Sequence, residues 1–313
     1  MWAREPLRPD ASGPHQSTNG TLGGSYADTM TFTGVSAFPL TPFVDDRIDE
    51  QAYAGIVRRV AASSVSSITA LGSTGSYAYL SREERAAALR IAVENSGEKP
   101  VLAGVGATRT RHVIEHVADA TEAGADGVLL APVSYQPLSD DEVLGLFRDV
   151  AGQSELPIVV YDNPRTTGYA FTPEMYARVA EIDGIASIKI PGVPAHPEAA
   201  AALVSRIRSM IPEHVTIGVS GDAFAAAGKA AGSDAWYSVL AGTLPDEAVR
   251  LWQTGEDDLQ ELWEIYAEAG GGLRVMAAIA EQFGLVRRPC LPRPLIGLDD
   301  EVRERLAGVL ARA

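Results

Sequence analysis

A repeat constrains the fold of this chain more than any other feature. From Thr33 onward, short apolar runs alternate with amphipathic segments. This alternation is typical of βα units built around parallel strands. The predicted strands are GVSAF (34–38), SSITAL (66–71), PVLAGV (100–105), DGVLLA (126–131), PIVVYD (157–162), IASIKI (185–190), VTIGVS (215–220) and DAWYSV (234–239). Eight strands over roughly 220 residues predict a (β/α)8 TIM barrel.

Signals at the ends of the intervening segments support this reading. SREERAAALRIAVENSG begins with Ser81 three residues before Glu84, which is a capping box, and it ends at Gly97. TPEMYARVAEIDG starts with Thr172 and carries Pro173 in its first turn. An open doubly wound sheet is the structural alternative. Such a sheet usually has a Gly-rich fingerprint after its first strand, and GVSAFPLTPF is not one.

The chain divides into three predicted parts. Residues 1–30 are rich in Gly, Pro, Ser and Thr without periodicity, which predicts a mobile N-terminal extension that lacks the apolar core of a signal peptide. Residues 31–243 form the predicted barrel. Residues 244–313 contain four helix-like segments and no strand-like run. We expect them to form a C-terminal helical region that packs on the barrel.

Composition narrows the possible partners. The formal charge of −15 argues against a nucleic-acid partner, because a phosphate backbone would be repelled. No run reaches the roughly 18 apolar residues of a membrane span. The one cysteine, Cys290, excludes an intramolecular disulfide framework and fits a reducing compartment. We therefore expect a cytoplasmic protein that acts on small molecules.

Lys189 stands inside the apolar run IASIKI and is one of only three lysines in the chain. Burying an ammonium group there would cost several kcal/mol, so the position needs an explanation. One explanation is a strand-end lysine whose tip reaches water. The other is a desolvated amine with a lowered pKa, which is a nucleophile that forms Schiff bases with carbonyl compounds.

Other reactive groups follow neighbouring strands, and in a barrel these strand ends converge at one mouth. Tyr161 ends the fifth strand and is either a core residue or a proton shuttle. Arg165 is either a solvated charge or a carboxylate ligand. Ser73 and Thr74 lie in the Gly-flanked turn LGSTGS, which is either an ordinary loop or a site for a carboxylate or a proton relay. With Lys189, these groups match a class I, metal-free aldolase.

A metal-dependent reaction is the chemical alternative. His112 and His116 are spaced i, i+4 on a predicted outer helix, but they lack the glutamate of an H-E-x-x-H motif. His196 and His214 are isolated. We therefore predict no metal and no other cofactor.

Seven motifs in this chain occur in the order found in one known family. They are GVSAFPLTPF, GSTGS, AGVGA, GADGVLLAP, VVYDNPRTTG, ASIKIPG and SGDAF. From about Gly34 to its end, the chain resembles the dihydrodipicolinate synthase and N-acetylneuraminate lyase family of pyruvate-dependent aldolases. The separation of Tyr161 and Lys189 (189 − 161 = 28) also agrees with that family.

The resemblance implies a homotetrameric barrel in which Lys189 forms a Schiff base with pyruvate or another 2-oxo acid. It implies that Tyr161 shuttles protons, that Ser73 belongs to the same relay, and that Thr74 helps to bind the pyruvate carboxylate. Further residues match positions near the bound substrate: Tyr237, whose main chain would approach pyruvate, and the turn residues Gly221 and Asp222.

The chain also departs from the family pattern. Ser76 replaces the glutamate that usually ends the hydroxyl motif. Ser134 stands where the family synthase has a tyrosine that completes the proton relay across a subunit interface, and Tyr135 follows one residue later. The family's arginine comes five residues after the catalytic tyrosine, whereas here Thr166 has that place and Arg165 precedes it.

These features predict a pyruvate-dependent lyase similar to 4-hydroxy-tetrahydrodipicolinate synthase, with a 2-oxo acid and an aldehyde as substrates. The departures leave two related activities open: a 2-keto-3-deoxy sugar acid aldolase or dehydratase, and an N-acetylneuraminate-type lyase. The alternative from another class is a non-catalytic ligand-binding or regulatory barrel, since a fold does not determine a function.

Overall fold

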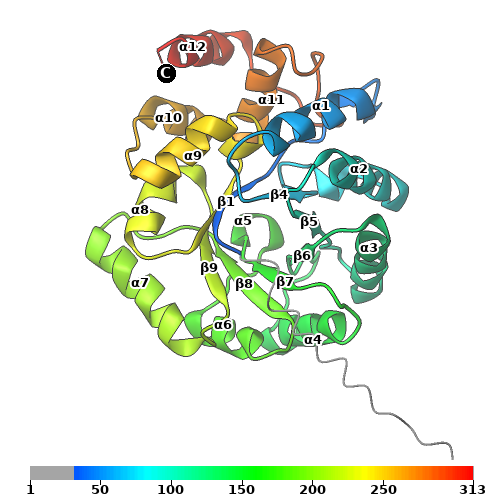
Figure 1. The fold of residues 1–313 in the computed structure, drawn as a ribbon, viewed down its shortest axis with the longest axis vertical. Helices are drawn as coiled ribbons and strands as arrows, with labels where there is room; N and C mark the ends of the chain where they lie inside the picture. The colour runs from blue at the N-terminus through cyan, green and yellow to red at the C-terminus, as the bar shows by residue number, and fades with distance from the viewer. Residues whose placement is uncertain (1–31, 313) are drawn as a thin grey trace, which may run out of the picture. The chain divides into compact units, whose positions relative to one another are not determined.

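The computed structural model describes residues 32–312, in which eight parallel strands close into a barrel in the order β1-β10-β9-β8-β7-β6-β5-β4 (Figure 1). The strands are β1 (Gly34–Ala37), β4 (Ser67–Ala70), β5 (Val101–Gly104), β6 (Gly127–Leu130), β7 (Ile158–Tyr161), β8 (Ile185–Ile190), β9 (Thr216–Val219) and β10 (Ala235–Ser238). Each predicted run contains one of them, so the predicted (β/α)8 barrel is confirmed. The prediction for residues 1–30 lies outside the described residues.

Helices surround the strands on the outside (Figure 1). Those that follow successive strands are α1 (Glu50–Ala61), α2 (Arg82–Asn95), α3 (Thr110–Ala123), α4 (Asp140–Ala151), α6 (Pro173–Ala180), α7 (Pro197–Met210), α8 (Ala225–Ala230) and α9 (Pro245–Thr254). The predicted capping box is present at α2, where the Ser81 hydroxyl accepts the Glu84 N–H and the Glu84 carboxylate accepts the Ser81 N–H.

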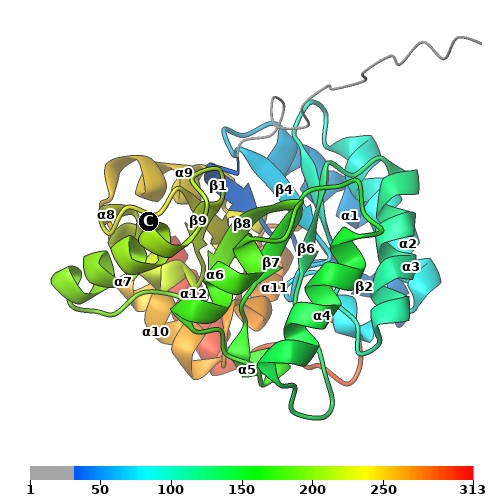
Figure 2. The same cartoon turned by 90° about the horizontal axis from the view of Figure 1, so that it is seen from below.

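The predicted C-terminal helices are α10 (Gln260–Glu268), α11 (Gly272–Gln282) and α12 (Asp300–Leu310), which pack against one another. Two 3-10 helices lie at the ends of strands: α10 contacts η3 (Asp222–Phe224), and α11 contacts η4 (Leu240–Gly242). The eighth helix of the barrel, α9, packs on β1 and α8, so it lies within the segment that we assigned to the C-terminal region. Figure 2 shows α10 and α11 at the same end of the barrel as the short helix α5 (Pro164–Thr167).

The sequence patterns gave no sign of a small hairpin after β1. Its strands, β2 (Phe43–Val44) and β3 (Arg47–Ile48), are too short to produce a periodic pattern. Asp45 and Asp46 connect them with φ angles of 50° and 61°. Aspartate tolerates this left-handed conformation better than most residues, which explains a two-residue turn without glycine.

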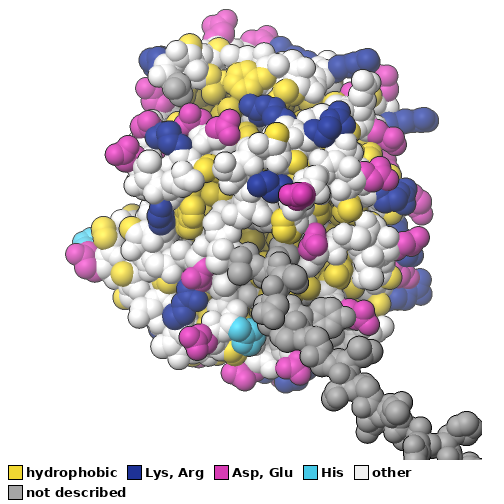
Figure 3. Space-filling view, in the orientation of Figure 1, with side chains coloured by type: hydrophobic (Ala, Val, Ile, Leu, Met, Phe, Trp, Pro, Cys, Tyr) yellow, Lys and Arg dark blue, Asp and Glu magenta, His cyan; other side chains and the backbone are white. Residues whose placement is uncertain are grey.

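The outer surface carries charges of both signs. On the face drawn in Figure 3, acidic and basic side chains are intermingled, with apolar atoms between them. Within residues 32–312, no helix has both the length and the apolar character needed to cross a bilayer.

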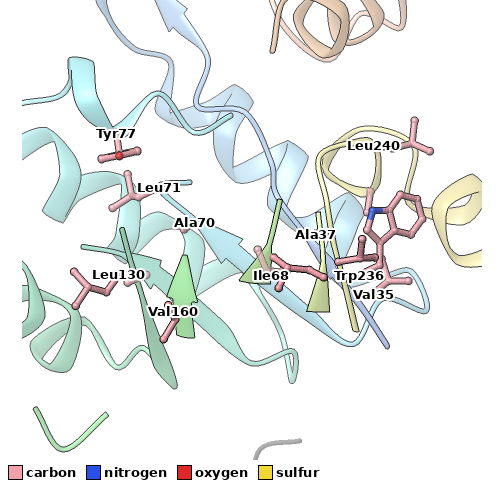
Figure 4. Close-up of a cluster of buried hydrophobic side chains, with 14 of the residues drawn as sticks. Val35, Ala37, Ile68, Ala70, Leu71, Tyr77, Leu130, Val160, Trp236 and Leu240 are labelled. Carbon is pink, nitrogen blue, oxygen red and sulfur yellow. The ribbon is translucent and has the colours of Figure 1, made fainter. Parts of the chain in front are cut away.

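The main core lies between the strands and the surrounding helices. Successive side chains of a strand point to opposite faces, so every second strand residue contributes to this layer. Figure 4 shows part of the cluster, in which Val35, Ala37, Ile68, Val160 and Trp236 are fully or almost fully buried.

The alternate strand residues fill the inside of the barrel, and several of them carry hydroxyl groups. Ser36 lies 2.8 Å from both Thr69 Oγ1 and Ser67 Oγ. On the other side, the Ser187 hydroxyl accepts bonds from Thr216 Oγ1 at 2.8 Å and from the Tyr237 hydroxyl at 2.7 Å. Because each buried hydroxyl finds a partner, this polar layer forms without the cost of unpaired groups.

Candidate active site

Lys189 and Tyr161 lie side by side on neighbouring strands of the barrel. In the register of β8 with β7, Lys189 pairs with Tyr161, and in the register of β8 with β9, Lys189 pairs with Gly218. The Lys189 side chain points inside the barrel, one layer above the Ser187 hydroxyl, because the two residues are two positions apart on one strand. The structure therefore brings together the two residues that the sequence singled out first.

The Lys189 amine lies among aromatic rings. The residue is only 3% exposed, so its tip does not reach water along the strand end. Its Nζ atom is 3.9 Å from the centre of the Phe38 ring, 4.0 Å from that of Tyr161 and 5.8 Å from that of Tyr237. Burial lowers the pKa of Lys189 to about 7, and the negative charge of Asp222 partly opposes this shift. A large share of the amine is therefore neutral near neutral pH.

Two glycines make space for the rings beside the amine. A Cβ atom on Gly72 would lie 2.5 Å from the nearest atom of the Phe38 ring. A Cβ atom on Gly218 would lie 2.2 Å from the Tyr237 ring. Carbon atoms in contact are normally about 3.5–4.0 Å apart, so any larger residue at either position would displace a ring.

The Tyr161 hydroxyl belongs to a triangle of polar side chains. Its oxygen is 3.2 Å from Ser73 Oγ. The Asn163 amide donates to the Tyr161 oxygen at 2.9 Å and to Ser73 Oγ at 3.3 Å. Burial raises the pKa of Tyr161, while the bonds from Ser73 and Asn163 act in the opposite direction because they favour the ionised form. Sequence reasoning missed Asn163, since an asparagine before a proline normally indicates a helix cap.

The turn that carries Ser73 has a strained backbone. Leu71 and Ser76 have φ angles of 58° and 56°, in the left-handed region that residues other than glycine rarely adopt. Strand β5 approaches so closely that a Cβ atom on Gly104 would lie 1.9 Å from the Leu71 carbonyl oxygen. Thr74 is buried in the same turn. Such strain persists only where the surroundings fix it, and it concentrates at functional sites.

Asp222, which follows Gly221 in the turn after β9, organises the loops at the mouth. Gly221 has a φ angle of 76°, and Asp222 is 3% exposed. Burial raises the pKa of Asp222 to about 6, although its hydrogen bonds oppose the shift. The carboxylate accepts bonds from the Trp236 indole N–H, the Ser238 hydroxyl, the Val239 and Leu240 main-chain N–H groups and the Tyr266 hydroxyl.

Tyr237 is fully buried inside the barrel, where its hydroxyl donates to Ser187. Burial raises its pKa. The hydroxyl is thus directed away from the mouth, and the expected role of the Tyr237 main chain at the substrate stays a prediction.

Three candidate groups do not join this cluster. Arg165 is exposed, and its Nη2 atom donates to the Gly270 carbonyl at 2.5 Å, although its charge is near enough to favour the ionised form of Tyr161. Tyr135 is 91% exposed, and the Ser134 hydroxyl donates to the Gln136 carbonyl. Within this chain, neither Ser134 nor Tyr135 reaches Tyr161.

Sequence reasoning also missed a buried arginine that lies against the loop after β5. Arg85 is 6% exposed and donates to the carbonyl oxygens of Gly104 and Gly106, which holds the loop after β5 in place. Burial lowers its pKa to about 10. The loop borders a narrow crevice, too small to hold a water molecule, that is lined by Leu71, Gly72, Tyr77, Gly104, Gly106, Leu129, Ala131 and Tyr161.

The histidine pair of α3 offers no third ligand. Burial lowers the pKa of His116 to about 4, and the charge of Arg85 adds to this effect. Among residues 32–312, no three His, Cys, Asp or Glu side chains are grouped so that they could hold a metal ion.

Comparisons with known proteins agree on one family. Residues 31–313 match the Dihydrodipicolinate synthetase family. A dihydrodipicolinate synthase from Agrobacterium tumefaciens has a solved structure that is 39% identical, with a TM-score of 0.84 over 90% of this chain and 97% of that one.

Two curated relatives are similar over nearly their whole length. An uncharacterized DapA-like lyase of Halobacterium salinarum is 30% identical over 305 residues, which cover 91% of this chain and 95% of the relative. A 4-hydroxy-tetrahydrodipicolinate synthase of Methanothrix thermoacetophila is 30% identical over 295 residues, which cover 90% and 97%.

Proposed function

The chain belongs to the dihydrodipicolinate synthetase family, and from this premise we propose that it is a pyruvate-dependent lyase that works through a Schiff base on Lys189. The observation that carries the proposal is the buried Lys189 amine, whose pKa is lowered to about 7 beside Tyr161. An amine that is neutral near pH 7 can attack a ketone, whereas an ordinary lysine ammonium cannot.

The first step joins the enzyme and the substrate. The neutral Lys189 amine attacks C2 of pyruvate, and one proton moves from the nitrogen to the former ketone oxygen, which gives a carbinolamine. Tyr161 then gives its proton to the carbinolamine hydroxyl, which leaves as water. The products are a protonated imine on Lys189 and a tyrosinate at Tyr161.

The second step produces the carbon nucleophile. The Tyr161 oxygen takes a proton from C3 of the imine, so the electron pair of that C–H bond forms the C=C bond of an enamine. Tyr161 is neutral again. When the enamine carbon attacks an aldehyde, the C=C electron pair forms the new C–C bond, the imine is restored, and the aldehyde oxygen takes the proton of Tyr161. Run backwards, the same steps cleave a carbon–carbon bond and release an aldehyde and pyruvate.

The pyruvate carboxylate needs donors at the same mouth, because a chain with a charge of −15 otherwise repels an anion. We assign this role to the Ser73–Gly75 turn, where the Thr74 hydroxyl and main-chain N–H groups can converge on one anion. We assign Gly221 and the main chain of Tyr237 to the border of the same site. Arg165, at the rim, is assigned to the carboxylate of the second substrate.

Two substrate classes fit this chemistry. The name of one relative supports a 4-hydroxy-tetrahydrodipicolinate synthase. For that activity we expect aspartate semialdehyde as the second substrate. An aldolase, dehydratase or sialic-acid-type lyase acting on keto sugar acids is favoured by Thr166 at the family's arginine position and by the bond of Arg165 to Gly270. A homotetramer and a cytoplasmic location stay predictions.

The Schiff base can be tested by chemical trapping. Incubation with pyruvate and sodium borohydride should add one reduced pyruvate to the intact protein, and Lys189→Ala should remain unmodified. Lys229→Ala, which removes a lysine held at the outer surface by the Trp252 and Gln253 carbonyls, is the matched control and should be modified like the wild type. A wild-type protein that acquires no adduct would favour the non-catalytic barrel instead.

A substrate panel then separates the two classes. Aspartate semialdehyde and a set of 2-keto-3-deoxy sugar acids are offered to the same enzyme preparation, and consumption or release of pyruvate is measured. Fast condensation of aspartate semialdehyde without turnover of sugar acids identifies a synthase, and the opposite result identifies a sugar acid lyase or dehydratase.

A further inference from the structure

The side chain of Asn163 does not serve the helix that it begins. Asn163 is the N-cap residue of α5, a position where the side chain normally accepts an N–H of the first turn. Here the side chain makes no such bond. The first turn is closed instead by the Asn163 main-chain carbonyl, which accepts the N–H groups of Thr166 and Thr167. The side-chain amide of Asn163 is therefore available to form hydrogen bonds outside α5.

The amide nitrogen of Asn163 donates to two hydroxyl oxygens of the proposed site, at 2.9 Å from Tyr161 Oη and 3.3 Å from Ser73 Oγ. With the Ser73 oxygen accepting from Asn163, the Ser73 hydrogen can be donated to Tyr161 at 3.2 Å. The Tyr161 oxygen then accepts two bonds, and its own hydrogen remains available for the substrate.

We propose that Asn163 is a positioning residue of the proton shuttle, and that with Ser73 it forms a two-donor site for the Tyr161 oxyanion within a single chain. This inference rests on the proposed Schiff-base function. It also accounts for the absence of a tyrosine at position 134, because Asn163 supplies from the same chain a donor that the family synthase takes from a second subunit.

The arrangement matters at the step in which Tyr161 carries a negative charge. After Tyr161 has protonated the carbinolamine hydroxyl, its oxygen holds the charge until it takes the C3 proton. Donors fixed in advance around a developing oxyanion stabilise it more than mobile water does. Asn163 touches no substrate atom in this scheme and acts only through Tyr161 and Ser73.

Exchange of the pyruvate methyl protons with D2O tests the inference without knowledge of the second substrate. Each cycle of enamine formation and reprotonation at C3 replaces hydrogen by deuterium, which NMR detects. We expect Asn163→Ala to slow exchange by about 10²–10³-fold, the usual effect of removing one such donor. The pyruvate concentration at half-maximal rate should change less than twofold, because Asn163 does not contact pyruvate.

The pH profile separates this role from a general loss of structure. The exchange rate should fall at alkaline pH, where Tyr161 loses the proton that it must donate; this fall is the alkaline limb of the profile. Loss of the Asn163 donor should raise the pKa of Tyr161, so the alkaline limb should move to higher pH in Asn163→Ala. Asn163→Asp keeps the shape but places a carboxylate beside the Tyr161 oxygen, so it should slow exchange as well and move the limb further. Asn95→Ala removes an asparagine amide that lies outside the barrel, where it donates to the Ile91 carbonyl and accepts from Arg58, and this variant should match the wild type.

The outcomes are distinguishable. Wild-type exchange rates and an unchanged alkaline limb in both Asn163 variants would overturn the inference while borohydride trapping upholds the Schiff base. A wild-type enzyme that neither traps nor exchanges pyruvate would overturn the proposed function and this inference together. If Asn163→Ala does not fold, as judged by its thermal unfolding, the isosteric Asn163→Asp decides between support and refutation.

Discussion

At the scale of single residues, the Lys189 amine is reactive because folding places it where its charged form is disfavoured, which is a conflict between folding and ionisation. Its surroundings are three aromatic rings and an Asp222 carboxylate that is already saturated by five hydrogen bonds. An ammonium in this place loses its hydration, and the cation–π contacts replace only part of it. The position therefore disfavours the charged form that the unfolded chain would have.

This conflict predicts that Lys189→Met stabilises the fold. Methionine fills a similar volume without a charge. The free energy of unfolding of the variant should therefore be about 2–4 kcal/mol higher than that of the wild type at pH 7 or below. The pKa of Lys189 is about 7 in the folded protein, whereas a solvated lysine, as in the unfolded chain, has a pKa of about 10.5. Between pH 7 and pH 10.5, the unfolded wild-type chain binds more protons than the folded protein. The free energy of unfolding of the wild type therefore rises with pH over this range, and its difference from that of Lys189→Met should shrink.

Denaturant unfolding of both proteins from pH 6 to pH 10 measures this difference. Lys99→Met is the surface control and should leave the free energy of unfolding nearly unchanged. If Lys189→Met were less stable than the wild type at pH 6, the amine would be a stabilising part of the core rather than a strained one.

Single residues also set the limit of what the sequence could predict about the site. Lys189 was identifiable because a lysine in an apolar run contradicts the local pattern. Asn163 contradicts nothing locally, because an asparagine before a proline is an ordinary start of a helix. Only the fold shows that its amide turns toward Ser73, a residue 90 positions away.

At the scale of elements, the strands could be predicted and several connections could not. The buried parallel strands appear as apolar runs, and helix starts such as Ser81 carry their own capping signals. The hairpin of β2 and β3, the helix α5 and the close approach of Gly104 to the β4 end produce no periodic pattern. The hairpin strands are too short for such a pattern, and the other two features depend on residues far apart in the chain, such as Gly104 with Leu71 and Arg165 with Gly270, which local signals do not encode.

The close packing of β9 and β10 around Lys189 gives a prediction for Gly218→Ala. The added methyl group would overlap the Tyr237 ring at 2.2 Å, so this ring, whose centre is 5.8 Å from the Lys189 amine, must shift or the strands must separate. We expect a loss of about 1–3 kcal/mol in the free energy of unfolding. Borohydride trapping of pyruvate should also slow, because the displaced ring occupies space beside the amine.

Gly145→Ala is a matched control for this change. Gly145 lies in helix α4, and an added Cβ atom there would meet nothing within 4 Å. The substitution should stabilise the helix by up to about 1 kcal/mol and leave trapping unchanged. Equal effects of the two substitutions would mean that the space beside Tyr237 is not tightly packed.

At the scale of the whole molecule, the net charge works against the proposed substrate. The chain carries a formal charge of −15, although Figure 3 shows that single acidic and basic groups are intermingled on the surface. Such a net charge creates a negative potential that lowers the local concentration of pyruvate anions. Salt shortens the range of this potential to about 10 Å at 0.1 M.

We therefore expect added salt to speed the reaction at low pyruvate concentration. Between about 0.01 and 0.2 M KCl, the rate of borohydride-trapped adduct formation at subsaturating pyruvate should rise several-fold. Methyl pyruvate has no charge, and its rate of adduct formation should not depend on salt. If salt lowered the rate for pyruvate but not for methyl pyruvate, the positive charges near the mouth, such as Arg165, would attract pyruvate more strongly than the net negative charge repels it.

The pairing of Tyr161 with Lys189 across β7 and β8 has an evolutionary consequence. The relative position of the two reactive groups is set by main-chain hydrogen bonds between neighbouring strands, which do not depend on the identity of loop residues. Connections such as 131–139 and the residues after Asn163 (164–172) can therefore diverge, lengthen or change charge while Asn163 and the paired strands maintain the chemistry at the ketone. A lineage with this barrel can acquire a new second substrate by drift in its loops, without passing through an inactive ancestor.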